Sequence, residues 1–268
     1  MQFERFESGL WRTASLLLAS EAEAVLIDPG IAEAEVAAIG ARAAALGATV
    51  THVLATHGDW DHLCGIAAFP DATAWMGPGT AERVLSGRAA ARIASAARDH
   101  GLSVAGSPRV DAVLEVGQAH RVGPFVVETA PLPGHTPDGV CYRVRALDLL
   151  IVGDHLSAVE FPFATSTVAY RATLGGLIDL LRHDPPGTVV PGHGPVLTAG
   201  EALSIAETDL AYLRGLRAAV ASVLGSGGDR VEARAAALAV SLPRQAPADL
   251  AEMHGANVDA QLDELLPG

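Results

Sequence analysis

Residues 50–65, VTHVLATHGDWDHLCG, decide how this chain is interpreted. An apolar run of β-type residues at 50–55 is followed by four polar side chains within six residues, His57, Asp59, Asp61 and His62. In an apolar setting, carboxylates and imidazoles this close together would repel one another or lack hydrogen-bond partners. Zinc, iron and manganese, in contrast, accept both groups as ligands. The stretch predicts a metal site, although a polar loop with two solvated histidines is an open alternative for this motif alone.

Three further candidate ligands follow apolar runs later in the chain. His135 lies in APLPGHTPDG, Asp154 in LLIVGDH and His193 in TVVPGHGP. In each case Gly or Pro interrupts a strand-like run, and the polar residue comes directly after it. A single His beside Gly is more often a turn or surface residue than a ligand. Four strand ends that repeat one arrangement favour metal ligands.

In this order the motifs resemble the metallo-β-lactamase-fold superfamily, and in particular its glyoxalase-II-like metal-dependent hydrolases. The usual signature is HxHxDH followed by a His, an Asp and a His. Asp59 departs from it, because it occupies the place of the second His. The resemblance implies an α+β fold, a four-layer αββα sandwich with a C-terminal helical extension. Residues 1–198 are expected to form the core, and residues 199–268 to be helices packed on it within the same domain.

The resemblance also implies two divalent metal ions and a role for each motif residue. The ligands of the first ion would be His57, Asp59 and His135, those of the second Asp61, His62 and His193, with Asp154 as the bridge. Asp61 is in addition the expected catalytic residue. Two ions about 3.5 to 4 Å apart would share a water, lower its pKa toward neutrality and polarise the scissile carbonyl.

Asp59 is expected to remain a ligand, because an Asp oxygen lies about as far from Cβ as the Nδ1 of His does. Charge is the larger difference, since the set then holds three carboxylates instead of two. The extra carboxylate should weaken the metals as Lewis acids and favour iron or manganese over zinc, the metal that the family implies. A related alternative is that the first ion binds weakly and the enzyme works with the second alone.

Hydrolysis of a small ester, thioester or lactone by a metal-bound water is the predicted function. One alternative is an iron-dependent oxidoreductase of the persulfide-dioxygenase or flavodiiron kind, because flavodiiron proteins place a carboxylate, Glu, at this position. No flavin domain is expected here, which makes that interpretation the poorer one. Another alternative is a non-catalytic metal-binding member. The predicted substrate contacts lie in the loop after Asp154 and the segment that follows it: Phe161, Phe163, Tyr170 and Arg171.

Composition and charge limit the classes of partner and the cellular location that we expect for this protein. The formal net charge is −13 and all 18 basic residues are Arg, with no run of them, which argues against nucleic-acid binding. Two Cys residues make no disulfide framework, and both are interpreted as packed. The first residues lack the pattern of a secretory signal, and no apolar run is long enough for a bilayer. A cytoplasmic protein with a small-molecule substrate is expected, and a homodimer is left open.

Periodicity predicts elements along the whole chain. Strands are expected at 13–19, 24–28, 50–55, 73–76, 112–116, 119–122, 125–129, 140–145, 149–152 and 188–190. Helices are expected at 33–46, 169–181, 199–224, 231–240 and 248–266. Residues 79–107 are interpreted as a helical insertion, with a mobile lid as the alternative. His254 and Asn257 in the tail are expected to be structural.

Overall fold

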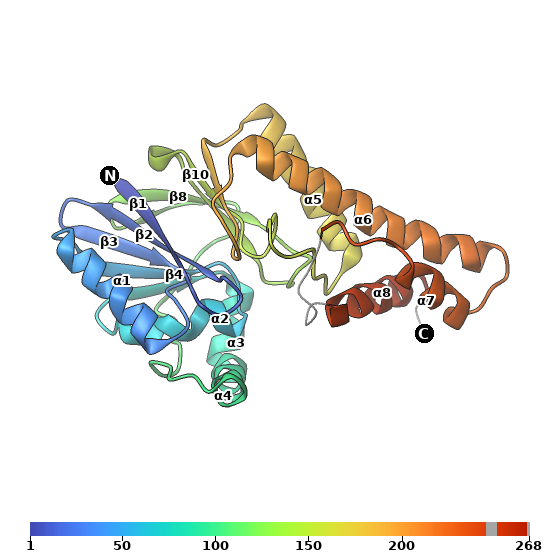
Figure 1. Ribbon diagram of the computed structural model, residues 1–268. Helices are drawn as coiled ribbons and strands as arrows, with labels where there is room; N and C mark the ends of the chain where they lie inside the picture. The colour runs from blue at the N-terminus through green and yellow to red at the C-terminus, as the bar shows by residue number, and fades with distance from the viewer. Residues whose placement is uncertain (245–250, 267–268) are drawn as a thin grey trace. The chain divides into compact units, whose positions relative to one another are not determined.

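The computed structural model describes residues 1–244 and 251–266. The chain divides into two compact units (Figure 1). The first unit comprises Met1–Leu132, Asp138–Gly153 and Val190–Gly194. The second comprises Pro133–Pro137, Asp154–Val189 and Pro195–Gly268. The expected domain limits, 1–198 and 199–268, stay a prediction.

The first unit contains a six-stranded mixed sheet. Its strands, in spatial order, are β1 (Gln2–Glu7), β2 (Ala14–Ser20), β3 (Glu23–Ile27), β4 (Thr49–Ala55), β5 (Thr73–Met76) and β6 (Ala112–Val113). Neighbours are antiparallel from β1 to β3 and parallel from β3 to β6. The metal motif follows β4, which lies between two parallel neighbours. Its polar residues therefore emerge at the carboxyl edge of this part of the sheet.

A second sheet in this unit is antiparallel. It contains β7 (Ala119–Val122), β8 (Phe125–Pro131), β9 (Val140–Val144) and β10 (Leu149–Ile151). Val190, the last residue of β11 (Thr188–Val190), extends its edge, because the Val152 amide donates to the Val190 carbonyl at 3.0 Å. The loop with His193 therefore starts beside the end of β10.

The two sheets pack face to face, and strand periodicity assigns each side chain to a layer. In β2, Leu16 and Leu18 join a core cluster with Phe125 and Tyr142 of the second sheet, whereas Leu17 points into a different cluster. Successive side chains of a strand face opposite sides. Both faces of β2 are covered, which explains why its sequence ASLLLAS is apolar without alternation.

Helices cover the other face of the first sheet. They are α1 (Glu33–Ala45), α2 (Trp60–Leu63), the 3-10 turn η1 (Cys64–Ala68), α3 (Pro78–Leu85) and α4 (Arg88–His100). Ile39 of α1 and Ile93 of α4 are buried in the same cluster as Leu17. The insertion predicted at 79–107 is thus helical as far as His100, with Ala81, Ala89, Ile93 and Ala96 buried in the core of the first unit and Leu85 exposed.

One strand prediction needs correction, and one strand was not predicted. The strand expected at 112–116 ends at Val113, although Leu114 is still buried. β1 was not predicted, because its sequence QFERFE is an edge strand with partly exposed, charged side chains. Edge strands of this kind carry a weak hydrophobic signal. β1 pairs antiparallel with its neighbour β2, and Phe3 lies opposite Leu18.

The second unit is mainly helical. Its helices are α5 (Thr167–His183), α6 (Ala199–Gly225), α7 (Arg230–Leu238) and α8 (Ala251–Leu265). The hydroxyl of Thr198 accepts from the Glu201 amide at 3.2 Å, and the Glu201 carboxylate accepts from the Thr198 amide at 2.8 Å, so a capping box starts α6. Leu210, Leu213 and Leu216 form a buried stripe along this helix. Among the described residues, no helix combines the length and apolarity that a bilayer span requires.

Candidate metal centre

The motif residues of the first unit are held in a tight turn between β4 and α2. β4 ends at Ala55, and Asp59 is the N-cap of α2, which places Asp61 and His62 in its single turn. His57, Asp61 and His62 are 2%, 4% and 0% exposed. Charged or polar groups this deeply buried need specific partners.

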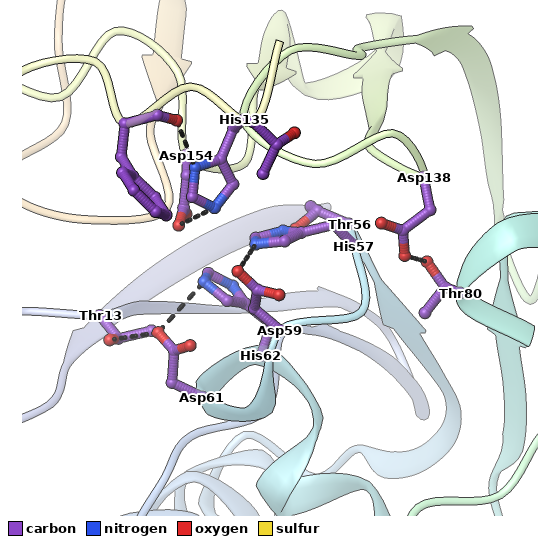
Figure 2. Close-up of polar contacts among 12 residues, drawn as sticks. Thr13, Thr56, His57, Asp59, Asp61, His62, Thr80, His135, Asp138 and Asp154 are labelled. Carbon is purple, nitrogen blue, oxygen red and sulfur yellow. Dashed lines mark hydrogen bonds and ion pairs between the residues drawn. The ribbon is translucent and has the colours of Figure 1, made fainter. Parts of the chain in front are cut away.

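Asp61, His62 and His193 bring three ligand atoms together. Asp61 Oδ2 lies 3.2 Å from His62 Nε2 (Figure 2). It lies 3.5 Å from His193 Nε2, and the three ligand atoms are all within 4.8 Å of one another. Two ligands bonded to zinc at about 2.1 Å in tetrahedral geometry are roughly 3.4 Å apart. The donor types and their spacing therefore fit one divalent ion.

The other ring nitrogen of each of these histidines is held by an acceptor. His62 Nδ1 lies 3.0 Å from Asp28 Oδ2, and His193 Nδ1 lies 3.0 Å from the carbonyl of Trp11. Carboxylate and carbonyl oxygens accept but do not donate, so Nδ1 carries the proton in both rings. That tautomer places the lone pair on Nε2, the atom beside Asp61.

His57 is held in the same way through Thr56. The Thr56 hydroxyl donates to Asp28 Oδ2 at 2.8 Å, which uses its only proton, so it accepts from His57 Nδ1 at 3.0 Å. The Thr56 amide donates to the other oxygen of Asp28 at 2.8 Å. One carboxylate thus sets the orientation of His57 and His62 together.

Asp28 was not predicted as a functional residue and was expected only as the last residue of a strand. The available signal is its position directly after β3, the strand next to β4, because carboxyl ends of neighbouring parallel strands share one edge of the sheet.

Thr13 was not predicted as a functional residue either. Its hydroxyl donates to Asp61 Oδ2 at 3.1 Å (Figure 2). Its backbone forms an isolated β-bridge with His193. No local pattern marks Thr13.

Asp59, the unusual motif residue, faces both His57 and a cation. Its Oδ2 lies 3.8 Å from His57 Nε2, while its Oδ1 accepts from Arg83 Nη2 at 2.9 Å. The side chains of Asp59 and Arg83 are 30% and 27% exposed. Asp59 is therefore paired with the guanidinium of Arg83, which was not predicted as a site residue.

His135 and Asp154, in the second unit, form their own pair. His135 Nε2 lies 3.1 Å from Asp154 Oδ2, and His135 Nδ1 donates to the carbonyl of Phe163 at 2.9 Å (Figure 2). The Tyr170 hydroxyl donates to the backbone carbonyl of Asp154 at 3.1 Å. His135 thus has the same tautomer as the three histidines of the first unit, with its Nε2 beside a carboxylate.

The predicted substrate residues lie in the second unit as well. Phe161 is 3% exposed and its ring meets Tyr212 edge to face, with centroids 6.0 Å apart. Tyr170 is buried and stacks on His155. The Phe163 ring meets His135 edge to face, and Arg171 donates to Gln261 Oε1 at 2.8 Å. Their contact with substrate stays a prediction.

Both cysteines are buried. Burial raises the pKa of Cys64 to about 12, with the nearby Asp61 carboxylate adding to the effect. Burial likewise raises the pKa of Cys141 to about 11. Thiols with such pKa values are weak nucleophiles and poor metal ligands at neutral pH. The packed role expected for both agrees with these surroundings.

Residues 8–193 match the family described as the metallo-beta-lactamase superfamily. A curated relative, the hydroxyacylglutathione hydrolase of Jannaschia sp. (strain CCS1), is 29% identical over 161 residues, which cover 59% of this chain and 54% of that relative. The match thus spans about half the length of this relative. Its name supports the predicted metallo-hydrolase class.

Solved structures agree with this assignment. The metallo-beta-lactamase family protein TTHA1429 from Thermus thermophilus aligns with a TM-score of 0.70 at 18% identity, covering 98% of this chain and 92% of that one. TTHA1623, solved in a di-iron-bound form, aligns with a TM-score of 0.56 at 29% identity, covering 74% of this chain and 96% of that one. The predicted α+β fold, a metallo-β-lactamase sandwich with C-terminal helices, is confirmed.

Proposed function

The chain belongs to the metallo-β-lactamase superfamily, and we propose that it is a metal-dependent hydrolase that cleaves a small ester, thioester or lactone. The observation that carries this proposal is the triad Asp61, His62 and His193, whose ligand atoms lie within 4.8 Å of one another. Both histidines hold their Nδ1 protons on acceptors and aim Nε2 toward Asp61. The hydrolase name of the curated relative supports the reaction class.

We assign the metal ligands as the family pattern implies. His57, Asp59 and His135 would hold one ion, Asp61, His62 and His193 the other, and Asp154 would join them. When bound, such ions supply Lewis-acid activation of a water and of the scissile carbonyl. The donor chemistry on each unit supports this assignment, because every histidine in it keeps its proton on Nδ1.

The protein's own part in catalysis is to keep these groups in place. Asp28 fixes His57 and His62, and Thr13 donates to Asp61, so the ligand atoms need no reorganisation when metal and substrate bind. Asp61 is the proposed catalytic residue, since its carboxylate would orient the attacking water as well as hold an ion. Its burial, at 4% exposure, keeps bulk water from competing at that oxygen.

The identity of the metal belongs to the proposal. Zinc is the metal expected for the family, and iron is supported by the di-iron form of TTHA1623 at 29% identity. Bound iron is also what the second candidate function, an iron-dependent oxidoreductase, would require. Asp59 agrees with either function, because carboxylates are ligands for zinc and for iron.

Metal analysis and turnover on one preparation test the proposal. Protein purified without added metal is analysed by mass spectrometry of its metals and then assayed on a panel of aryl esters, thioesters and lactones. We expect metal-dependent hydrolysis, lost in Asp61→Asn and retained in Asp71→Asn, an exposed matched control. Oxygen consumption with bound iron and no hydrolysis would establish the oxidoreductase instead. A folded protein that binds no metal would contradict both functions.

A further inference from the structure

Arg83 of α3 connects two carboxylates beside the metal motif. Its Nη2 donates to Asp59 Oδ1 at 2.9 Å, and its Nη1 donates to Asp138 Oδ1 at 3.2 Å. The Asp138 side chain is 4% exposed, and its other oxygen accepts from the Thr80 hydroxyl at 2.9 Å (Figure 2). A guanidinium group forms two such bonds in fixed directions, which a lysine ammonium does not.

The surrounding backbone leaves room for this arrangement. A Cβ atom at Gly58 would come within 2.7 Å of Arg83 Cδ and 2.7 Å of Asp138 Oδ2, and a Cβ at Gly79 within 2.6 Å of Asp138 Cβ. Real Cβ atoms do not approach other atoms so closely. Gly58 lies between His57 and Asp59 in the motif itself, so the motif is shaped to admit Arg83.

Arg83 occupies only one oxygen of Asp59. The other oxygen, Oδ2, faces His57 Nε2 at 3.8 Å, a separation that two ligands of one ion can have. The contact with Arg83 therefore does not withdraw Asp59 from the metal motif. It fixes the rotation of the carboxylate so that one oxygen points to His57.

Arg83 supplies one positive charge to two carboxylates. Compared with the usual ligand set, Asp59 contributes one additional negative charge, and Arg83 places its positive charge at hydrogen-bond distance from both Asp59 and Asp138. Burial alone would lower the pKa of Arg83, but attraction to Asp59 and Asp138 outweighs it and raises the pKa. The guanidinium group therefore stays charged at neutral pH.

We propose that Arg83 is a positioning residue that offsets the negative charge of Asp59 and holds its Oδ2 in place as a metal ligand. This inference rests on the metal centre of the proposed function. It predicts that the Arg83 cation, which Asp59 and Asp138 share, reduces the additional negative charge that Asp59 brings to the ligand set.

Metal affinity of the substrate-free protein is the direct test. Cobalt and zinc affinities are measured by competition with a chromogenic chelator. Arg83→Gln removes the cation but keeps a side-chain amide that can donate to Asp59, so the site becomes one unit more negative and divalent ions should bind about tenfold more tightly. Structural damage would weaken binding, so it cannot imitate this result. Arg88→Gln on α4, which removes the same charge from an exposed pair with Glu82, should leave the affinity unchanged.

Two further variants separate charge from geometry. Arg83→Lys keeps the charge and should bind metal within about threefold of the wild-type affinity, with an altered visible spectrum of the cobalt form because the two-pronged contact is lost. Asp59→His alone should weaken metal binding, since the site then loses one carboxylate while the Arg83 cation remains, and Asp59→His/Arg83→Gln should restore it. Such coupling is what a double-mutant cycle detects.

The outcomes distinguish this inference from the proposed function. Unchanged or weaker metal binding in Arg83→Gln, or strictly additive effects of the Asp59 and Arg83 substitutions, would overturn the role of Arg83 while hydrolysis by the wild-type protein stood. The predicted affinity pattern without any hydrolysis would support Arg83 and overturn the proposed reaction. A wild-type protein that binds neither metal would overturn both.

Discussion

Asp28 and His62 are joined by a hydrogen bond in the interior of the first unit, with Asp28 Oδ2 3.0 Å from His62 Nδ1. They are 3% and 0% exposed. Asp28 also accepts from the amide and the hydroxyl of Thr56, so its carboxylate has three donors. This buried carboxylate is what orders the histidines of the motif.

Replacing Asp28 should therefore loosen metal binding without touching a ligand. In Asp28→Asn the side chain keeps its size but loses its charge, and His62 is no longer restricted to one tautomer. We expect metal affinity to fall by about 10- to 100-fold, measured by chelator competition. Asp148→Asn is a matched control, because both aspartates have φ near 50° and Asp148 is 66% exposed. Equal affinities in the two variants would contradict the role of Asp28.

Thr13 should matter through its hydroxyl alone. Thr13→Val keeps the shape of this fully buried side chain but removes the donor to Asp61. We expect a loss of about 1–2 kcal/mol in the free energy of unfolding and about a tenfold decrease in kcat/KM. Thr13→Ser should retain most of both. Chemical denaturation and steady-state kinetics measure the two effects, and a Val variant as active and stable as the Ser variant refutes the prediction.

Removing the metal should destabilise the fold, because Asp61, His62 and His193 would then lie close together in the interior without an ion. A ligand present at about 1,000 times its dissociation constant stabilises the native state by roughly 4 kcal/mol. In a chain of this size that corresponds to a decrease in Tm on the order of ten degrees after chelation. Added metal should restore the Tm. Asp61→Asn serves as the control, since its Tm should respond little to the chelator.

The two cysteines should be unreactive in the native protein. With pKa values raised to about 12 for Cys64 and about 11 for Cys141, almost no thiolate is present at pH 8. We expect no alkylation by iodoacetamide at pH 8, and alkylation of both thiols after denaturation. Mass spectrometry of the intact protein measures the extent of alkylation in the native and in the denatured protein. Rapid labelling of the folded chain would show that one of these thiols is reachable and ionised.

Asn257 of α8 should be a structural residue of the second unit. Its Oδ1 accepts from the Ala164 amide at 2.8 Å, and its Nδ2 donates to the Pro162 carbonyl at 2.5 Å and to the Tyr212 hydroxyl at 3.2 Å. Asn257→Ala would leave these buried groups unpaired, so we expect a loss of about 3 kcal/mol in the free energy of unfolding. Glu252→Ala, an exposed change on the same helix, should cost far less.

The sequence by itself determined the elements and the metal motif. Strand alternation, helical spacing and Gly or Pro breaks depend on neighbouring residues, so they identified most of the strands and helices that the structure contains. The cluster in HGDWDH is equally local, since its four polar side chains follow one buried strand. The order of the later motifs indicated the family, which the match over residues 8–193 confirmed.

Only the tertiary structure decided which residues hold these ligands in place. Asp28 reaches His62 because β3 and β4 pair in parallel, with Ile27 opposite Leu54, so both strands end at one edge. Arg83 is one of 18 arginines, and nothing in its neighbourhood along the chain distinguishes it from the others. Its role comes from the fold of α3, which brings it to Asp59 across 24 positions of sequence. Contacts at such separations depend on the packing of whole elements, and no local pattern records them.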